Sequence, residues 1–240
     1  MTKQEQLALL GQGVFQWNQF RLTTPALRID LSGMNLAGRN LKQINLDGAN
    51  LFDANLSGSD LSGAHISQAN LSEANLSEAL LIDAILSHAN LSEADLSQAT
   101  LYRTDLNHAN LLKTDLSGAD LTEAKIREAN LYLVIADRAV FKKADLRESK
   151  MRGGKLQHAD MEGANLGMAD LTQSSLLNAN LSRVDFTNTA LIQANLRGAR
   201  IQNVRNLTET QLTKAHSLQG ALLDPDLHEI LLAKYPALFQ

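Results

Sequence analysis

The chain has 240 residues, of which 44 % are hydrophobic but only 4 % aromatic. It contains no cysteine, which excludes disulfides and thiolate metal sites, and its formal net charge of -4 gives no general basic signature for nucleic acid. No apolar run reaches the length of a membrane span and no charged-then-apolar leader opens the chain. We therefore expect a cytoplasmic protein that contacts no membrane and binds no nucleic acid directly.

Residues 1–28 lie outside the pattern that governs most of the chain. Residues 4–10 are compatible with a short helix that ends before Gly11 and Gly13. Apolar side chains then follow at irregular spacing: Val14, Phe15, Trp17, Phe20 and Leu22. We interpret this segment as an N-terminal cap over the structure that follows.

From residue 29 to residue 203 the chain repeats every five residues. The central apolar position falls on every residue number ending in 1 or 6, from Leu31 to Ile201, which gives 35 repeats, 27 of them centred on Leu. The residue two before the centre is Ala in 22 repeats, and the residue just before the centre is Asn or Asp in 23. Neither the helical period of about 3.6 nor the strand period of about 2 produces this spacing. A unit with two inward residues in five cannot close a core alone, so the repeats must wind into a solenoid.

The repeat resembles the pentapeptide-repeat family, whose pattern is A-(D/N)-L-x-x, as in Ala-Asn-Leu-Ser-Glu at residues 69–73. The segment at residues 17–21, leading to Asp30 and Leu31, is similar to the start of cyanobacterial members. The resemblance implies an all-β solenoid, a right-handed quadrilateral β-helix with four repeats per coil and about nine coils. Residues twenty positions apart would then stack one above another.

The pattern stops after residue 203, and two capping boxes follow. Thr208 with Gln211 predicts a helix to about residue 215, and Asp226 with Glu229 predicts another over residues 227–234, which Pro236 ends. We interpret residues 204–240 as a helical C-terminal cap. The alternative is that this end forms a homodimer contact, with these apolar residues available to a second copy: Leu231, Tyr235, Leu238 and Phe239.

Stacking at twenty residues converts the sequence into surface columns. One column is an Asn ladder (Asn50, Asn70, Asn90, Asn110, Asn130), and two others alternate in charge (Asp83, Arg103, Glu123, Lys143 and Asp105, Lys125, Asp145). His88, His108, Glu128 and Glu148 form a further column with metal-ligand chemistry. Because stacked side chains run parallel instead of converging, we predict no metal and no cofactor. A Leu-filled rod without a nucleophile elbow or phosphate loop also indicates that the protein is not an enzyme.

The surface is unusual around residues 124–155. This band has a net charge of +5, whereas residues 29–123 have a net charge of -9. Tyr and apolar residues replace the usual polar ones within the same band, and aromatic and Arg side chains are typical of interface centres. We therefore predict a protein partner at a corner formed by Leu112, Tyr132, Leu133 and Ile135 with Arg152, and a second patch that includes Ile82 and Tyr102.

These features favour a non-catalytic scaffold or regulatory protein that works through protein–protein interaction. The family resemblance implies one alternative. Some members confer quinolone resistance by mimicking duplex DNA and binding gyrase, and the acidic N-terminal half is compatible with that role. No gyrase-contacting residue can be assigned to this sequence.

Overall fold

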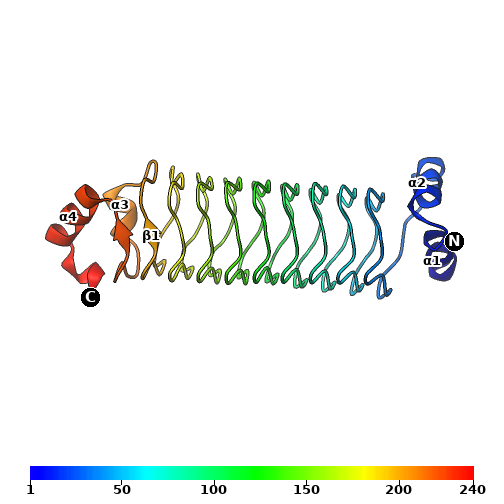
Figure 1. Cartoon of the computed structure of the whole chain (residues 1–240), viewed down its shortest axis with the longest axis horizontal. Helices are drawn as coiled ribbons and strands as arrows, with labels where there is room; N and C mark the ends of the chain where they lie inside the picture. Colours follow the sequence, from blue (N-terminus) through cyan, green and yellow to red (C-terminus); the bar gives the residue numbers. More distant parts are fainter.

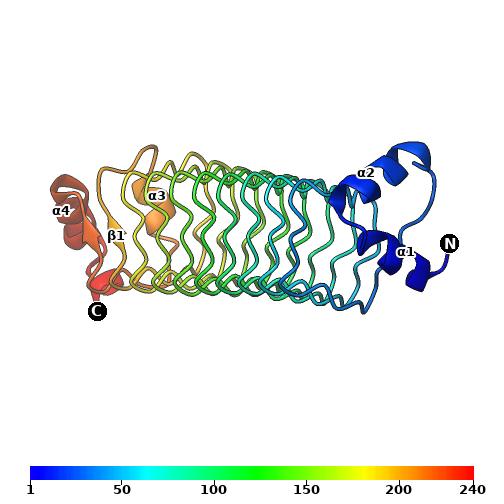
Figure 2. The same ribbon diagram turned by 45° about the vertical axis from the view of Figure 1, so that its right-hand side comes forward.

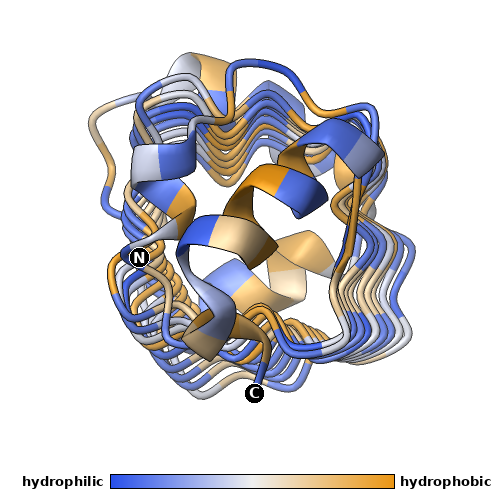
Figure 3. Cartoon of the chain, turned by 90° about the vertical axis from the view of Figure 1, so that its left-hand side faces the viewer, coloured by the Kyte–Doolittle hydropathy of each residue, from blue (hydrophilic) through white to orange (hydrophobic).

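The computed structural model describes residues 1–240 as one straight rod of stacked coils (Figure 1). Parallel bridges join residues twenty positions apart along the rod, from Asp30 with Asn50 to Asp185 with Arg205. Viewed along its axis, the rod has a four-sided outline in which successive coils superpose (Figure 3). The predicted coil of four repeats is therefore confirmed.

The conformation of one repeat explains its residue preferences. The residue before the apolar centre makes the bridge to the next coil, and its side chain caps the turn that follows: Asp95 Oδ1 accepts a hydrogen bond from the Ser97 N–H at 2.8 Å. The second turn residue has positive φ in every repeat, whether it is Gly33 (66°) or Glu93 (60°). At non-glycine positions the turn is held by bonds between coils, as from the Glu93 N–H to the Leu112 carbonyl at 2.8 Å.

The core is a continuous axis of Leu with Ala beside it. Leu91 and Ala89, like most residues at these two positions, are 0 % exposed. Burying each Leu contributes about 1.5–3 kcal/mol, and every further coil adds more buried Leu side chains. Ala136 occupies an axis position, and the larger Phe141 is fully buried on the next side of the same coil. Where Thr replaces Ala its hydroxyl is satisfied, as Thr104 Oγ1 donates to the Leu81 carbonyl at 2.7 Å.

Two helices stand at the N-terminal end of the rod (Figure 2). Helix α1 (Lys3–Leu10) confirms the helix predicted there, and its Thr2–Glu5 capping box was not anticipated. Helix α2 (Val14–Thr23) was not predicted, because its apolar residues do not form one face. Trp17 on α2 is fully buried and its indole N–H donates to the Asn45 carbonyl at 2.7 Å.

The coil continues past residue 203, where the repeat ends. Strand β1 (Arg200–Ile201) pairs in parallel with β2 (Leu222–Leu223) at a spacing of 22 instead of twenty residues. The two extra residues accommodate helix α3 (Glu209–Leu212) within the last coil. The predicted Thr208–Gln211 capping box is confirmed, but the helix that it opens is a single turn and does not reach residue 215.

Helix α4 (Pro225–Lys234) and the 3-10 helix η1 (Pro236–Phe239) follow the last coil (Figure 1). The predicted Asp226–Glu229 capping box is wrong. Asp224 is the N-cap residue, Pro225 takes the first helical position, and the Asp224 carboxylate instead accepts the Asn203 N–H at 3.0 Å. None of the helices combines the length and the apolar character that crossing a bilayer requires.

Candidate protein-binding surface

The surface of the rod has only open depressions. The largest has a volume of about 690 Å³ and lies where α3 replaces one side of the last coil; Ile192, Thr208 and Lys214 are among its lining residues. Candidate functional residues are therefore better sought among side chains that project outward than inside a cavity.

The corner predicted from Leu112, Tyr132, Leu133 and Ile135 is present. Tyr132 and Leu133 are the two turn residues of one corner and are 42 % and 39 % exposed, while Leu112 and Ile135 are half-buried. Leu133 has φ 56°, a left-handed conformation that is uncommon for a bulky residue. Its side chain lies over Gly153 in the next coil, where a Cβ would meet Leu133 Cδ2 at 2.7 Å. An apolar side chain is thus held outward on a rigid turn.

Ile82 and Tyr102 belong to a different surface. They lie half a coil from the Tyr132 corner, which places them at the diagonally opposite corner of the four-sided rod. Tyr102 is half-buried there: its hydroxyl bonds Glu123 Oε2 at 3.3 Å, and the Arg103 guanidinium lies 5.2 Å from the ring centre. A single partner of ordinary size would not cover both predicted patches.

The basic band divides into paired and unpaired cations. Some of its side chains form ion pairs within the rod: Arg127 with Glu148, Lys142 with Asp160, Lys143 with Glu123 and Arg147 with Asp145. The cations nearest the Tyr132 corner do not. Lys150 and Lys155 belong to no ion pair, and Arg152 bonds only the neutral Gln173 Oε1, at 3.3 Å. Three of the five cations of the band that form no ion pair thus lie beside Tyr132, and the other two, Lys125 and Arg138, lie elsewhere on the coil.

The Asn ladder is confirmed, because each amide from Asn70 to Asn130 donates to the Oδ1 of the preceding Asn at 2.8–3.2 Å. The first charge ladder forms in part: Arg103 binds Asp83 at 2.5 Å. This hydrogen bond lowers the pKa of Asp83.

The second charge ladder is wrong, since Lys125 forms no ion pair and Asp145 instead binds Arg147 from its own repeat. Burial alone would raise the pKa of Asp145, but hydrogen bonds from Arg147 outweigh it and leave that pKa lowered. The prediction failed because the Arg147 side chain, two residues further along the chain, reaches Asp145 more readily than Lys125 does from the neighbouring coil.

The pentapeptide-repeat pattern matches overlapping segments from residue 29 to residue 224. The chain belongs to the pentapeptide-repeat family. Among solved structures, HetL, a pentapeptide-repeat protein involved in heterocyst differentiation regulation from the cyanobacterium Nostoc sp. strain PCC 7120, is 29 % identical, with 85 % of this chain and 90 % of HetL covered and a TM-score of 0.47. A trypsin-treated form of QnrB1, a plasmid-mediated fluoroquinolone resistance protein, is 21 % identical, with 87 % and 96 % covered and a TM-score of 0.51. No curated protein matches the sequence.

On this pentapeptide-repeat rod the histidine column runs parallel to the axis. The His88 and His108 rings stack at 4.7 Å with 8° between their planes, and His108 Nδ1 lies 3.5 Å from Glu128 Oε2. No group of three or more His, Asp or Glu side chains in the structure is arranged to hold a metal ion. The column thus has parallel imidazoles on its N-terminal part and carboxylates, at Glu128 and Glu148, on its C-terminal part.

The residues predicted to contact a second copy at the C-terminal end need correction. Leu231 is fully buried, and Leu238 and Phe239 pack on the core instead of being exposed. The Leu218 N–H donates to the Leu238 carbonyl at 2.6 Å, and the Phe239 ring lies edge-on to His228 at 5.2 Å, which ties η1 to the last coil and to α4. Of the four predicted residues only Tyr235, at 39 %, is exposed. Three exposed apolar residues at this end were missed: Leu222, Ile230 and Leu232.

Proposed function

We propose that this pentapeptide-repeat protein is a non-catalytic, cytoplasmic interaction protein that binds a protein partner at the Tyr132 corner. The observation that carries the proposal is the rigid display of Tyr132 and Leu133 beside unpaired cations. Tyr132 is 42 % exposed on a turn fixed by inter-coil bonds, so little side-chain and backbone freedom is lost when a partner binds. Aromatic anchors bordered by Arg are typical of residues that carry binding energy.

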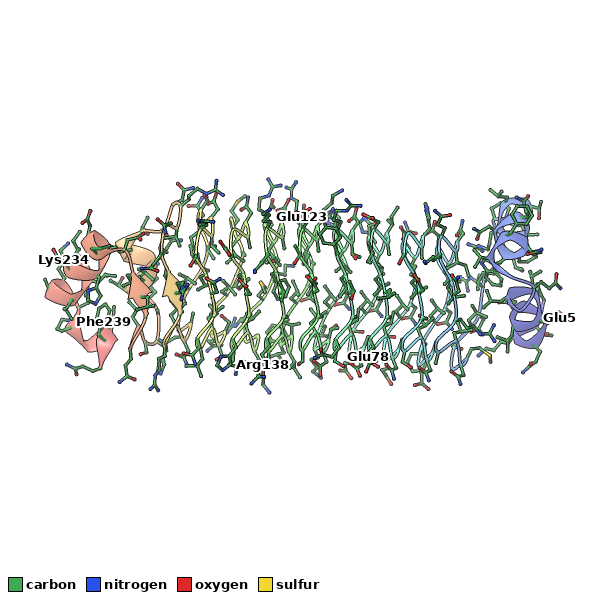
Figure 4. The ribbon with its side chains drawn as sticks, in the orientation of Figure 1. Glu5, Glu78, Glu123, Arg138, Lys234 and Phe239 are labelled. Carbon is green, nitrogen blue, oxygen red and sulfur yellow. The ribbon has the colours of Figure 1, made fainter.

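A DNA-mimicking role is the second candidate, favoured by the net charge of -9 over residues 29–123. The distribution of that charge supports it less well. Asp83 and Glu93 are paired with Arg103 and Lys113. The acidic side chains also occupy more than one corner of the rod, since Glu78 and Glu123 project from the lower and the upper edge in the view of Figure 4. A supercoiling assay with purified gyrase tests this candidate: inhibition at micromolar protein would favour it over the first.

The division of the chain into functional parts also belongs to the proposal. We propose that residues 1–28 and 204–240 cap a right-handed β-helix that begins at residue 29, although the pairing of β1 with β2 extends the coil itself to residue 223. Side chains of α1 and α2 support the capping role, because they bond backbone groups of the first coil that have no preceding coil to pair with. For example, Gln6 Oε1 accepts the Asp30 N–H at 2.9 Å.

The binding proposal is tested by affinity capture from the source cells. The bait carries Tyr132→Ser with Ile135→Ser, and the matched control carries Ile82→Ser with Tyr102→Ser on the opposite corner. We expect the first pair to lose a protein that the wild type and the control retain. If the first pair retains every bound protein and the wild-type oligomeric state, the Tyr132 corner is not the binding site.

A further inference from the structure

One flat side of the rod carries three outward columns, and we call it the Asn-ladder face. Its centre is the bridge column from Asn50 to Asn130, continued by Lys150. One border is the turn column of His88, His108, Glu128 and Glu148. The other border is the turn column that contains Leu112 and Tyr132. Because consecutive coils superpose along a straight rod, each column stays in line (Figure 3).

The apolar border is symmetric about one point. Phe52 and Ile192 are 40 % and 46 % exposed, and Tyr132 is 42 % exposed. Phe52 lies three coils before Leu112, and Ile192 lies three coils after Tyr132. The four residues are thus evenly disposed about the midpoint between the Leu112 and Tyr132 coils. The span from Phe52 to Ile192 is seven coil spacings, about 34 Å at ~4.8 Å per coil.

The other border column is complementary about the same midpoint. His88 and His108 lie before it, and Glu128 and Glu148 lie at the matching distances after it. Each imidazole thus has a carboxylate at the position related by inversion of the coil order, which is the requirement for an isologous contact.

We propose that the Asn-ladder face binds a second copy of this chain, with the two rods antiparallel about a two-fold axis at this midpoint. The proposal rests on the proposed function, of which it names the partner. Leu112 then faces Tyr132 of the second copy, Phe52 faces Ile192 at the rim of the largest depression, and His108 faces Glu128. A parallel pair would place the column of imidazoles and carboxylates against the apolar column, so the antiparallel order is the one that the chemistry selects.

The first test is the solution mass of the full chain by light scattering over a micromolar concentration series. We expect a dimer, and Tyr132→Asp should weaken it at least tenfold because it places a carboxylate opposite Leu112. Tyr102→Asp, on the opposite corner, is the matched control and should leave the dimer unchanged. Thermal melts of both variants establish that they fold. A monomeric wild type, or a dimer that Tyr132→Asp leaves intact, overturns the proposal.

The second test fixes the orientation of the two rods. The chain has no native cysteine, so Ser72→Cys and Thr172→Cys each give a single thiol. The two positions are five coils apart in one chain, about 24 Å, but face each other across the proposed contact. With a short bismaleimide we expect a covalent dimer when the two variants are mixed and none when either is treated alone. Linkage within one variant alone, or none in the mixture, overturns the antiparallel contact.

The two proposals can fail separately. If the wild type is monomeric but Tyr132→Ser with Ile135→Ser loses a captured protein, the Tyr132 corner binds a different protein and only the second-copy assignment falls. Suppose instead that a dimer forms, but that Tyr132→Asp leaves it intact and the bismaleimide does not link residues 72 and 172. If no captured protein depends on the Tyr132 corner either, both proposals fall.

Discussion

The two ends of the rod meet the same problem, an open coil edge, in different ways. At the N-terminal end the edge is met by side chains: Trp17 and Asn18 on α2 bond the Asn45 carbonyl, the Gln43 carbonyl and the Asn45 N–H. At the C-terminal end the backbone ladder itself continues through β2, and α4 follows only after an irregular last coil. An edge closed by a few side chains depends heavily on each one, whereas a continued ladder distributes the same bonds along the backbone.

The two ends also differ in how much apolar side chain they leave exposed to solvent. Phe15 and Leu22 on α2 are 71 % and 72 % exposed, more than any large apolar side chain of the last helices. Arg21, by contrast, is buried under α2, where desolvation lowers the pKa of its guanidinium and its Nη2 donates to the Asp47 carbonyl at 2.7 Å. On α2 the stabilising contacts are therefore concentrated on the face toward the first coil, and the opposite face carries exposed apolar side chains.

The largest expected effect follows from removing the buried ring at the N-terminal end. Trp17→Ala should cost about 3–5 kcal/mol, because it removes a fully buried side chain and leaves the Asn45 carbonyl without the indole donor. Urea unfolding followed by far-UV circular dichroism measures the loss. Phe15→Ala, on the exposed side of the same helix, should change stability by no more than about 0.5 kcal/mol. Equal effects of the two substitutions would mean that α2 does not protect the first coil.

The next effect compares an amide at the edge with one in the middle of the rod. Asn18→Ala removes both a donor to the Gln43 carbonyl and an acceptor for the Asn45 N–H, and should cost about 1–3 kcal/mol. Asn70→Ala interrupts the Asn ladder, but the backbone bonds of residue 70 to the preceding coil and those of residues 69 and 71 to the next coil remain, so we expect about 1 kcal/mol. A larger loss at Asn70 than at Asn18 would show that side chains matter more inside the rod than at its end.

Most of the rod could be predicted because the same five-residue pattern occurs in 35 consecutive repeats. Each apolar centre, small residue and Asn or Asp obeys the same geometry, so the spacing alone predicts a solenoid. The coil of four repeats was implied by the family resemblance, and the Asn ladder follows from that coil length. Helix α2 could not be predicted, because Trp17 and Arg21 share its buried face while Phe15 and Leu22 lie outside. Its position is decided by contacts with residues 43–47, which local propensity does not contain.

The candidate surface could be predicted only in part, for a similar reason. The exposure of Tyr132 follows from its place in the repeat, and so does its separation from Tyr102. The choice of partner for each charge does not, because a flexible side chain such as Arg147 can reach its own repeat as easily as the next coil. Leu231, Leu238 and Phe239 were misplaced because an amphipathic pattern shows which face is apolar but not whether the chain itself covers that face.

Substitutions of the polar residues that replace Ala in the core should change the stability of the rod only slightly. The sign of the change should depend on whether the polar group has a hydrogen-bond partner. Ser149 Oγ is buried without a hydrogen-bond partner, so Ser149→Ala should stabilise the rod by about 1 kcal/mol. Thr104→Val should destabilise it by about 1 kcal/mol, since it removes the hydroxyl donor to the Leu81 carbonyl. Parallel urea titrations of the two variants give the signs. If both substitutions stabilise the rod, the Thr104 bond does not contribute.

The smallest effect concerns acid, and it returns to the C-terminal end. The Thr187 hydroxyl, which donates to Asp185 Oδ1 at 2.6 Å, lowers the pKa of that carboxyl; burial opposes the shift, and the Asn206 amide reinforces it. Because the folded pKa lies below the unfolded value of about 3.9, the ionised carboxylate stabilises the fold above about pH 4, and this contribution is lost as the pH falls through the folded pKa. Asp185→Asn cannot titrate, so its deficit against the wild type, less than about 1 kcal/mol near pH 7, should shrink below pH 4. A deficit that stays constant from pH 7 to pH 3 would mean that the Asp185 contacts do not depend on its charge, and that the continued ladder alone holds this end of the rod.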